Sequence, residues 1–225
     1  MRFQDAAKDA RAVVYAGIQA DPLVARAATL LVKATAGERL LARAAMNGER
    51  TDAETWRRMF PALFGEGVDA ALRDHANQVL AASLEVAERG EAARSQYRGA
   101  LVEELTARLL AGRVGPDAPV RRERRVLFDG VRAEIHPYDV TVESEARPEV
   151  YDCKWGARGI NADVLNQLDD ARAHAADEEI KLAVAIVVFD SCSSCEVRLD
   201  RATAEHAGTR LIALESLDEL GQAAR

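Results

Sequence analysis

The sequence predicts an α/β domain with a mixed central sheet flanked by helices, preceded by an all-α N-terminal region. Apolar residues recur at three- and four-residue spacing through residues 1–90, the pattern changes to period two after Pro119, and residues 182–189 form an apolar run of strand length. The 225 residues are 48% hydrophobic and 30% charged, an ordinary globular composition that can bury a self-sufficient core. We therefore expect residues 1–90 to form a helical accessory or oligomerisation region and residues 91–225 to form the α/β domain.

The net charge of −7 lies entirely within residues 91–225, which argues against a protein that coats nucleic acid through bulk charge. No apolar run approaches the roughly 18–20 residues that a membrane span requires, and the first residues lack the apolar core of a signal peptide. Three cysteines without framework spacing indicate reduced thiols. We therefore expect a cytoplasmic protein with no membrane partner.

In the N-terminal region the helical spacing is seen, for example, at Leu23, Ala27 and Leu31, with breaks at residues 47–48 and 61–67. Basic and aromatic side chains form a patch in the segment from Trp56 to Phe64, which contains Arg57, Arg58 and Phe60. They could grip nucleic acid or a partner, although core packing with arginines extending to solvent explains them more simply. Because its charges balance, this region is better suited to homodimerisation or binding a partner protein than to clamping DNA.

The elements of the second region follow in order. A helix is expected from residue 91 to about 111, ending at Gly112, and the Asp129-Gly130 pair predicts a hairpin turn between two strands. The predicted strands cover 121–128, 131–143, 149–155, 182–189 and 210–214, and the predicted helices cover 160–176, 203–206 and 216–223. This mixed order, with an apolar central strand, indicates helices on both faces of one sheet.

One predicted strand carries charges that need an explanation. Along residues 149–155, Tyr151 and Cys153 share the face suited to the core, whereas Asp152 and Lys154 share the other face. Buried charges are costly unless they are paired or bind a metal. If the preceding strand is a hairpin neighbour, Asp139 approaches Asp152, and two carboxylates and an ammonium group converge where a Mg²⁺ ion could bind.

These residues resemble the PD-(D/E)XK nuclease superfamily. Asp139 follows Pro137 with Tyr138 between them, and Asp152-Cys153-Lys154 forms the second element of the motif. The helix at residues 98–105 resembles the family's acidic helix, with Glu103 as the match and Glu104 as the alternative, and Gln167 fits the glutamine of the following helix. The segment from residue 210 to residue 217 resembles the ending of the Mrr-like branch, so that the resemblance covers roughly residues 91–220.

The resemblance implies a restriction-endonuclease-like fold and a Mg²⁺-dependent phosphodiesterase, for which Mn²⁺ could substitute. The implied substrate is DNA rather than RNA, cut endonucleolytically, in restriction, phage defence or repair. The implied metal ligands are Asp139, Asp152, Glu103 and the Cys153 carbonyl. Lys154 would orient the attacking water and stabilise the developing charge, and Gln167 would bind near the nucleophile or a phosphate.

Other interpretations remain open. A lone Asp-x-Lys on a strand is usually an ion pair. A catalytically inactive member that binds nucleic acid or a partner protein, or a helical interaction protein with an α/β scaffold, would show the same residues.

Two further clusters have both a functional and an ordinary explanation. Arg121, Arg122, Arg124 and Arg125 could contact phosphates, or could belong to a solvated edge strand. Cys192 and Cys195 have metal-ligand spacing, but a zinc site needs about four ligands. We therefore expect a chance pair in a loop.

Overall fold

The chain folds into two compact units, which the computed structural model describes over residues 1–6, 10–48, 51–115, 118–132, 136–202 and 209–222. The sheet unit comprises Met1–Asp9 and Thr106–Arg225, and the helical unit comprises Ala10–Leu105. The division falls within helix α7 (Glu91–Arg113) instead of at residue 90. No helix in the described ranges is both long enough and apolar enough to cross a membrane.

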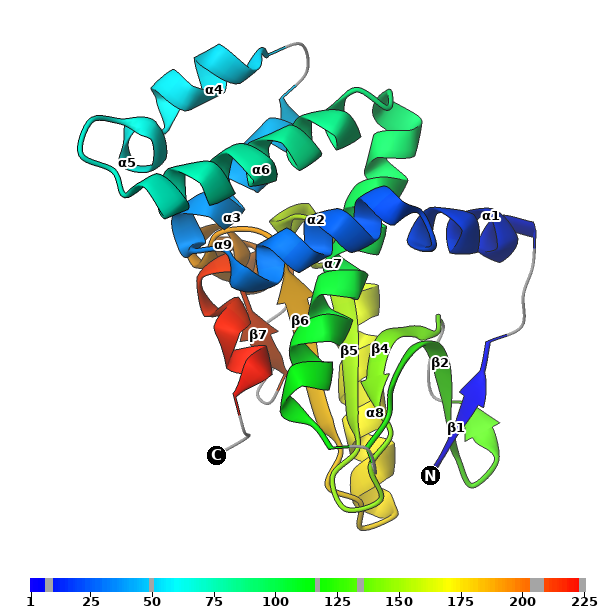
Figure 1. The fold of residues 1–225 in the computed structure, drawn as a ribbon. Coiled ribbons are helices and arrows are strands. Elements are labelled where there is room, and N and C mark those ends of the chain that lie inside the picture. Colours follow the sequence, from blue (N-terminus) through cyan, green and yellow to red (C-terminus); the bar gives the residue numbers. More distant parts are fainter. Residues whose placement is uncertain (7–9, 49–50, 116–117, 133–135, 203–208, 223–225) are drawn as a thin grey trace. The chain divides into compact units, whose positions relative to one another are not determined.

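The sheet unit confirms the predicted α/β class with a mixed sheet (Figure 1). Its strands lie in the order β1 (Arg2–Asp5), β2 (Val120–Phe128), β4 (Tyr138–Val142), β5 (Glu149–Lys154), β6 (Ala183–Val188) and β7 (Arg210–Ile212), with β3 (Val131–Arg132) paired to β2. The pairs from β1 to β5 are antiparallel, and β5, β6 and β7 are parallel. This order places β5, the strand of Asp152 and Lys154, inside the sheet.

The prediction that residues 1–90 are only helical was wrong at the beginning of the chain. Strand β1 pairs with β2, with Phe3 opposite Val126 and Asp5 opposite Arg124. The strand has only four residues, with Phe3 as its one apolar side chain, and the pairing joins positions more than a hundred residues apart in the chain. A segment this short does not by itself predict a strand.

The hairpin predicted at Asp129-Gly130 is confirmed. Asp129 has φ 46° and Gly130 has φ 79°, so both central residues are left-handed, as a type I′ turn requires. The single strand predicted over 131–143 is instead two strands, β3 and β4, and both pair with β2. Residues 133–135 between them lie outside the described part of the chain.

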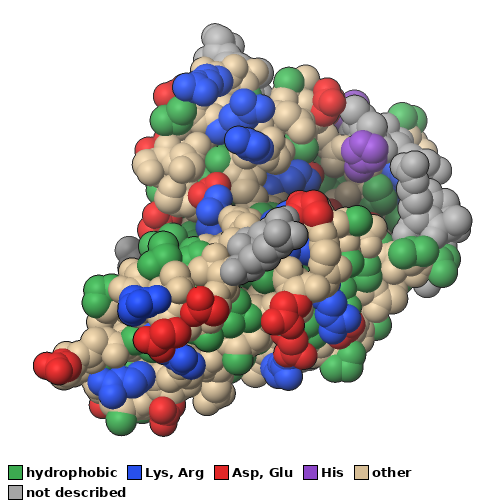
Figure 2. All heavy atoms as spheres, turned by 90° about the horizontal axis from the view of Figure 1, so that it is seen from above, with side chains coloured by type: hydrophobic (Ala, Val, Ile, Leu, Met, Phe, Trp, Pro, Cys, Tyr) green, Lys and Arg blue, Asp and Glu red, His purple; other side chains and the backbone are tan. Residues whose placement is uncertain are grey.

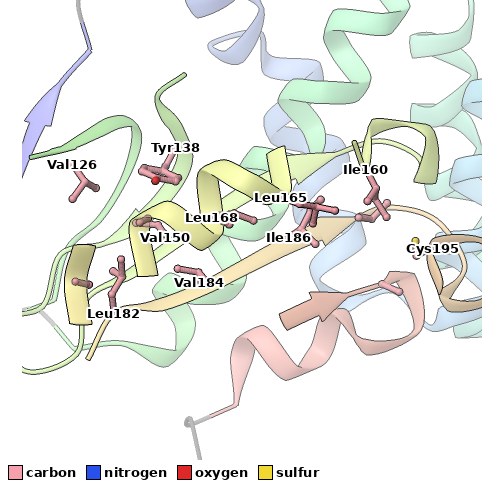
Figure 3. Packing of buried hydrophobic residues seen from close by; sticks show 14 of the residues in the cluster. Val126, Tyr138, Val150, Ile160, Leu165, Leu168, Leu182, Val184, Ile186 and Cys195 are labelled. Atoms are coloured by element: carbon pink, nitrogen blue, oxygen red, sulfur yellow. The ribbon is translucent and has the colours of Figure 1, made fainter. Parts of the chain in front are cut away.

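Helix α8 (Ala162–Asp177) packs against the sheet through the main apolar cluster. Leu165 and Leu168 of this helix face Val150 and Ile186 of the central strands (Figure 3). The last turns of α7 lie in front of the sheet in Figure 1 and α8 lies behind it. Helices therefore flank both faces of the sheet, as predicted.

The remaining elements of the sheet unit are α9 (Cys192–Ala202) and two 3₁₀ segments, η1 (Ala157–Gly159) and η2 (Leu214–Gly221). The predicted closing helix at 216–223 is therefore the 3₁₀ segment η2, whose Leu214, Leu217 and Leu220 are buried. The helix predicted at 203–206 lies outside the described residues.

The helical unit contains α1 (Ala10–Gln19), α2 (Pro22–Lys33), α3 (Ala36–Asn47), α4 (Ala53–Met59), α5 (Pro61–Phe64), α6 (Ala70–Ala87) and the first part of α7. Asp21, Asp52 and Asp69 cap three of these helices, and Thr35 with Glu38 forms a capping box.

The apolar core of the helical unit includes the aromatic side chains that the sequence left open to two interpretations. Trp56 is buried in a cluster with Leu41 and Leu80, and Phe60 and Phe64 pack against this cluster. Core packing therefore accounts for these three rings.

Candidate active site

Asp139 lies where β4 and β5 stop pairing. The two strands pair antiparallel with Val140 opposite Tyr151, so that Asp139 and Asp152 occupy the next pair of positions. The Asp139 carboxylate accepts a hydrogen bond from the main-chain N–H of Cys153 at 2.6 Å. The structure thus brings Asp139 and Asp152 together on neighbouring strands, as the sequence predicted.

Lys154 connects the two carboxylates. Its Nζ lies 3.8 Å from Asp139 Oδ2 and forms an ion pair with Asp152 Oδ1. Burial favours the neutral amine, but the charges of Asp139 and Asp152 outweigh it and hold the pKa of Lys154 above its usual value. The group is therefore a permanent cation, suited to stabilising negative charge and not to accepting a proton.

The environment of Asp152 is unusual for a carboxylate. The residue is only 6% exposed, and its buried Oδ1 atom contacts the Lys154 ammonium. A buried carboxylate is costly unless a cation balances it. The single positive charge of Lys154 offsets only one of the two carboxylate charges of Asp139 and Asp152, so the cluster keeps a net negative charge.

Glu123 is an acidic residue near Asp139 that the sequence analysis did not assign to the site. It lies on β2 with a left-handed φ of 53°, a conformation uncommon for a residue other than glycine. An oxygen of its carboxylate lies within 4.8 Å of one from Asp139. No local pattern could identify it, because in the sequence it is only the acidic residue within a run of arginines.

The donor set of the sheet unit fits a hard divalent cation. Asp139, Asp152 and Glu123 offer carboxylate oxygens, which Mg²⁺ and Mn²⁺ accept as ligands. Asp152 does not join Glu123 and Asp139 in one group with ligand atoms within 4.8 Å, and it faces Lys154 instead. Metal binding at Asp152 would therefore compete with the Lys154 ammonium.

Gln167 does not point a free amide into the site. Its Oε1 accepts from the main-chain N–H of His136 and its Nε2 donates to the His136 carbonyl, both at 3.0 Å. The side chain is buried on α8, and these two bonds fix the chain just before β4. Contact with the nucleophile or a phosphate stays a prediction; the observed contacts hold the backbone that leads to Asp139.

Glu103 belongs to the helical unit. It is buried on α7 and accepts hydrogen bonds from the Tyr15 hydroxyl at 2.5 Å and the Gln19 amide at 2.7 Å. The metal-binding role expected for Glu103 stays a prediction, as does that of the half-buried alternative Glu104.

Cys153 turns its thiol inward, as the alternation of β5 predicted. Its Sγ lies 3.6 Å from Thr106 Oγ1, and the side chain is buried. The thiol is therefore not available to the site, and the proposed contribution of Cys153 is limited to its main chain.

Arg124 and Arg125 lie on the part of β2 that pairs with β1, whereas Arg121 and Arg122 lie beyond that pairing and pair with β4. Arg124 ion-pairs with Asp5 and, at 2.6 Å, with Glu143. This arginine has a structural role, which corrects its assignment to a solvated edge. Phosphate contact by Arg121, Arg122 and Arg125 stays a prediction, and Arg121 is the exposed member.

Cys192 and Cys195 lie in the first turn of α9, so the prediction of a loop was wrong. Ser191 precedes this helix, and its hydroxyl caps it by accepting a hydrogen bond from the Ser194 N–H at 3.3 Å. The sequence analysis missed this cap because serine-rich segments are also typical of loops. Cys195 is buried in the main core, and neither cysteine forms a disulfide among the described residues. Within the described residues, neither belongs to a group of three side chains spaced to hold a metal.

Comparisons with known proteins do not assign the chain to a family. No family model matches the chain, and no curated protein matches it. A solved structure, protein VC1899 from Vibrio cholerae, is similar with a TM-score of 0.45 and 17% identity, over 98% of this chain and 56% of that one. The chain thus spans about half the length of that protein, and a similarity of this degree shows neither a shared fold nor a shared function.

Proposed function

We propose that the chain is a metal-dependent nuclease of the PD-(D/E)XK type with a restriction-endonuclease-like sheet unit, hydrolysing phosphodiester bonds in DNA. One observation supports this proposal above the others: Asp139, Asp152 and Lys154 converge where two central strands separate. An interior strand carries such charges at a cost in stability, and a catalytic site would explain why they are there.

The chemistry follows from the charges. A Mg²⁺ or Mn²⁺ ion held by Asp139 and Asp152 would neutralise the scissile phosphate and lower the pKa of a bound water. Lys154, which stays protonated, stabilises the charge that develops on the phosphorus oxygens. Asp139 is oriented by the Cys153 N–H, and Gln167 holds the backbone before it, so the first ligand is fixed before metal binds.

Glu123 and Glu103 are the further acidic groups in this proposal. Glu123 supplies a third carboxylate within the sheet unit, close to Asp139. Glu103 retains the role that the resemblance assigns to it, as an acidic residue on the helix before the sheet. Replacing each separately by glutamine distinguishes them, because only a carboxylate that binds metal should alter the affinity for Mn²⁺.

The alternative is a catalytically inactive protein with the same fold that binds nucleic acid or a partner. The contact of Lys154 with both carboxylates favours it, because the ammonium group already offsets part of their negative charge without a metal. In that case the charges would be structural, and no metal would displace the lysine.

Plasmid cleavage in Mg²⁺ or Mn²⁺ tests the proposal with four proteins: wild type, Lys154→Ala, Asp139→Asn and Lys181→Ala. Asparagine at 139 removes the charge but keeps an oxygen for the Cys153 N–H, and Lys181 is an exposed lysine of the same unit that serves as the control. We expect wild type and Lys181→Ala to cut equally, and the other two to lose on the order of 10²–10³-fold in rate.

Equal cleavage by all four proteins would show that the activity belongs to a contaminant or to another site. No cleavage by any of them, with no Mn²⁺ bound in calorimetry, would instead favour the inactive alternative. Metal binding by wild type that Asp139→Asn weakens, without cleavage of plasmid, would direct the search to RNA or to an activating partner.

A further inference from the structure

Gly159 lies against the aliphatic part of the Lys154 side chain. A β-carbon placed on Gly159 would come within 2.8 Å of Lys154 Cδ and 2.9 Å of its Cβ and Cγ. Real side chains essentially never approach so closely, and because the β-carbon of Lys154 is among these atoms, rotation of the lysine side chain alone could not relieve the clash. Only glycine leaves room for the lysine in its observed position.

A glycine is required at position 159 because a larger side chain would clash with Lys154, and not because the backbone adopts a positive φ angle there. Positive φ angles occur at Gly67, Gly90 and Gly130, but not at Gly159. The helical Gly112 of the same unit has nothing within 4 Å of the corresponding position. The requirement at 159 therefore comes from the neighbouring lysine.

The short η1 segment that carries Gly159 is held at both ends. The buried Asp190 accepts a hydrogen bond from the Ala157 N–H at 3.0 Å, and Arg198 of α9 donates to the Ile160 carbonyl at 3.2 Å. Within the segment, the Gly159 N–H donates to the Gly156 carbonyl at 2.8 Å. Neither end can move without losing a hydrogen bond.

We propose that residues 156–160 are a positioning element for Lys154, in which Gly159 confines the lysine stem so that its ammonium stays between Asp139 and Asp152, and Asp190 anchors the element. The inference rests on the proposed function for its catalytic consequence, but the placement of Lys154 is measurable without any cleavage. Gly159 and Asp190 are thus positioning residues that act through Lys154.

Amine acylation followed by peptide mass spectrometry reports on this placement, because the chain has only four lysines: Lys8, Lys33, Lys154 and Lys181. A lysine that is ion-paired and half-buried reacts slowly, and the exposed Lys33 and Lys181 serve as internal references. The variants are Gly159→Ala, Asp190→Ala, and Asp190→Asn, which keeps an oxygen for the Ala157 N–H. Gly112→Ala is the matched control.

We expect Gly159→Ala and Asp190→Ala to acylate Lys154 at least about 3-fold faster than wild type, with Lys33 and Lys181 unchanged. Gly112→Ala and Asp190→Asn should remain close to wild type. Where wild type cleaves DNA, the first two variants should lose about 10- to 100-fold in kcat with little change in KM, because a misplaced group costs that much.

Unchanged Lys154 acylation in Gly159→Ala would overturn the proposal, even if wild type proves to be a nuclease. If Gly159→Ala does not fold, the rate of Lys154 acylation in Asp190→Ala provides the test, and an unchanged rate in that variant would overturn the proposal. If wild type cuts no nucleic acid, the proposed function fails, whereas faster acylation of Lys154 in the variants would still support the positioning element.

Discussion

At the scale of single residues, the proposed site depends on Lys154, whose ammonium group contacts the two carboxylates that would bind the metal. Lys154 contacts both Asp139 and Asp152, and Asp152 is buried. A divalent cation must therefore compete with a tethered ammonium group. The strength of metal binding then depends on whether Lys154 is present.

Replacing Lys154 by alanine should increase the stabilisation that Mn²⁺ gives to the fold. The variant is expected to unfold more easily than wild type without metal, because Asp139 and Asp152 lose their counter-charge. Saturating Mn²⁺ should recover more of the melting temperature in Lys154→Ala than in wild type, because bound ligand stabilises the folded state by mass action. Thermal unfolding with and without Mn²⁺ measures both effects, and Lys181→Ala should behave as wild type. An absence of any Mn²⁺ effect would contradict a metal site.

At the scale of elements, a buried ion pair connects helix α7 to strand β5. Arg113 in the last turn of α7 ion-pairs with Glu149 at the start of β5 at 2.5 Å, and both side chains are less than a tenth exposed. The Tyr151 hydroxyl donates to the same carboxylate, and burial, with the Glu149 charge, holds the pKa of Tyr151 above its usual value. The pair holds the end of α7 beside the first residue of β5.

Arg113→Met should destabilise the protein by about 3–5 kcal/mol, since removing one partner leaves a buried, uncompensated carboxylate. Urea unfolding measures the loss. Arg113→Met combined with Glu149→Gln should recover part of the stability, because the remaining charge is removed. If the single variant costs less than about 1 kcal/mol, water reaches the pair and it is not buried in solution.

A second element-scale contact predicts a pH dependence. Asp21 caps α2 through the Leu23 N–H at 2.8 Å and accepts a hydrogen bond from the Tyr97 hydroxyl of α7. The Tyr97 bond, followed by the Leu23 bond, holds the pKa of Asp21 below its usual value. A lowered folded-state pKa contributes stability that is present above the unfolded value of about 3.9 and is lost as the pH falls through the folded value.

Asp21→Asn keeps one side-chain oxygen, which can accept from the Leu23 N–H, but it presents an amide NH₂ to the Tyr97 hydroxyl and cannot ionise. The difference in unfolding free energy between wild type and Asp21→Asn should therefore be constant near neutral pH and shrink as the pH falls below about 4. Denaturant unfolding followed by circular dichroism, at several pH values between about 2.5 and 7, checks this. A difference that does not change with pH would mean that Asp21 is not stabilised as a carboxylate.

At the scale of the whole molecule, the charge distribution governs how DNA could be bound. Acidic and basic side chains lie next to one another over much of the face drawn in Figure 2, and the chain carries a net charge of −7, all within residues 91–225. Counterion release by a basic surface is thus a weak source of affinity here. Under the proposed function, the metal or a partner protein must supply the attraction to phosphate.

DNA binding by the cleavage-impaired Lys154→Ala variant should therefore be weak in EDTA and at least about 10-fold tighter in Ca²⁺, an oxygen-liganded ion that replaces Mg²⁺ without promoting the reaction. Fluorescence anisotropy of a labelled duplex measures both affinities. Asp139→Asn should abolish the Ca²⁺ effect. Tight binding in EDTA would instead identify a basic surface, with the exposed Arg121 as the first residue to replace.

The fold was predicted best where the signal is local. The Asp129-Gly130 turn and the apolar strand β6 depend on neighbouring residues, and the structure bears them out, whereas α7 continues through Gly112, where the sequence predicted its end. Strand β1 and the helical start at Cys192 were missed. The first depends on pairing with a distant strand, and the second on a serine cap within a sequence that is typical of loops.

The sequence by itself determined that Asp152 and Lys154 share one face of β5, because side chains alternate along a strand whatever the rest of the fold does. Only the tertiary structure decided what these residues touch. Glu123, which has a left-handed backbone conformation on β2, lies close to Asp139 on the neighbouring strand β4. Gly159, in the turn after β5, confines the Lys154 side chain. Such contacts depend on strand register and on atomic volume, and a one-dimensional pattern encodes neither of them.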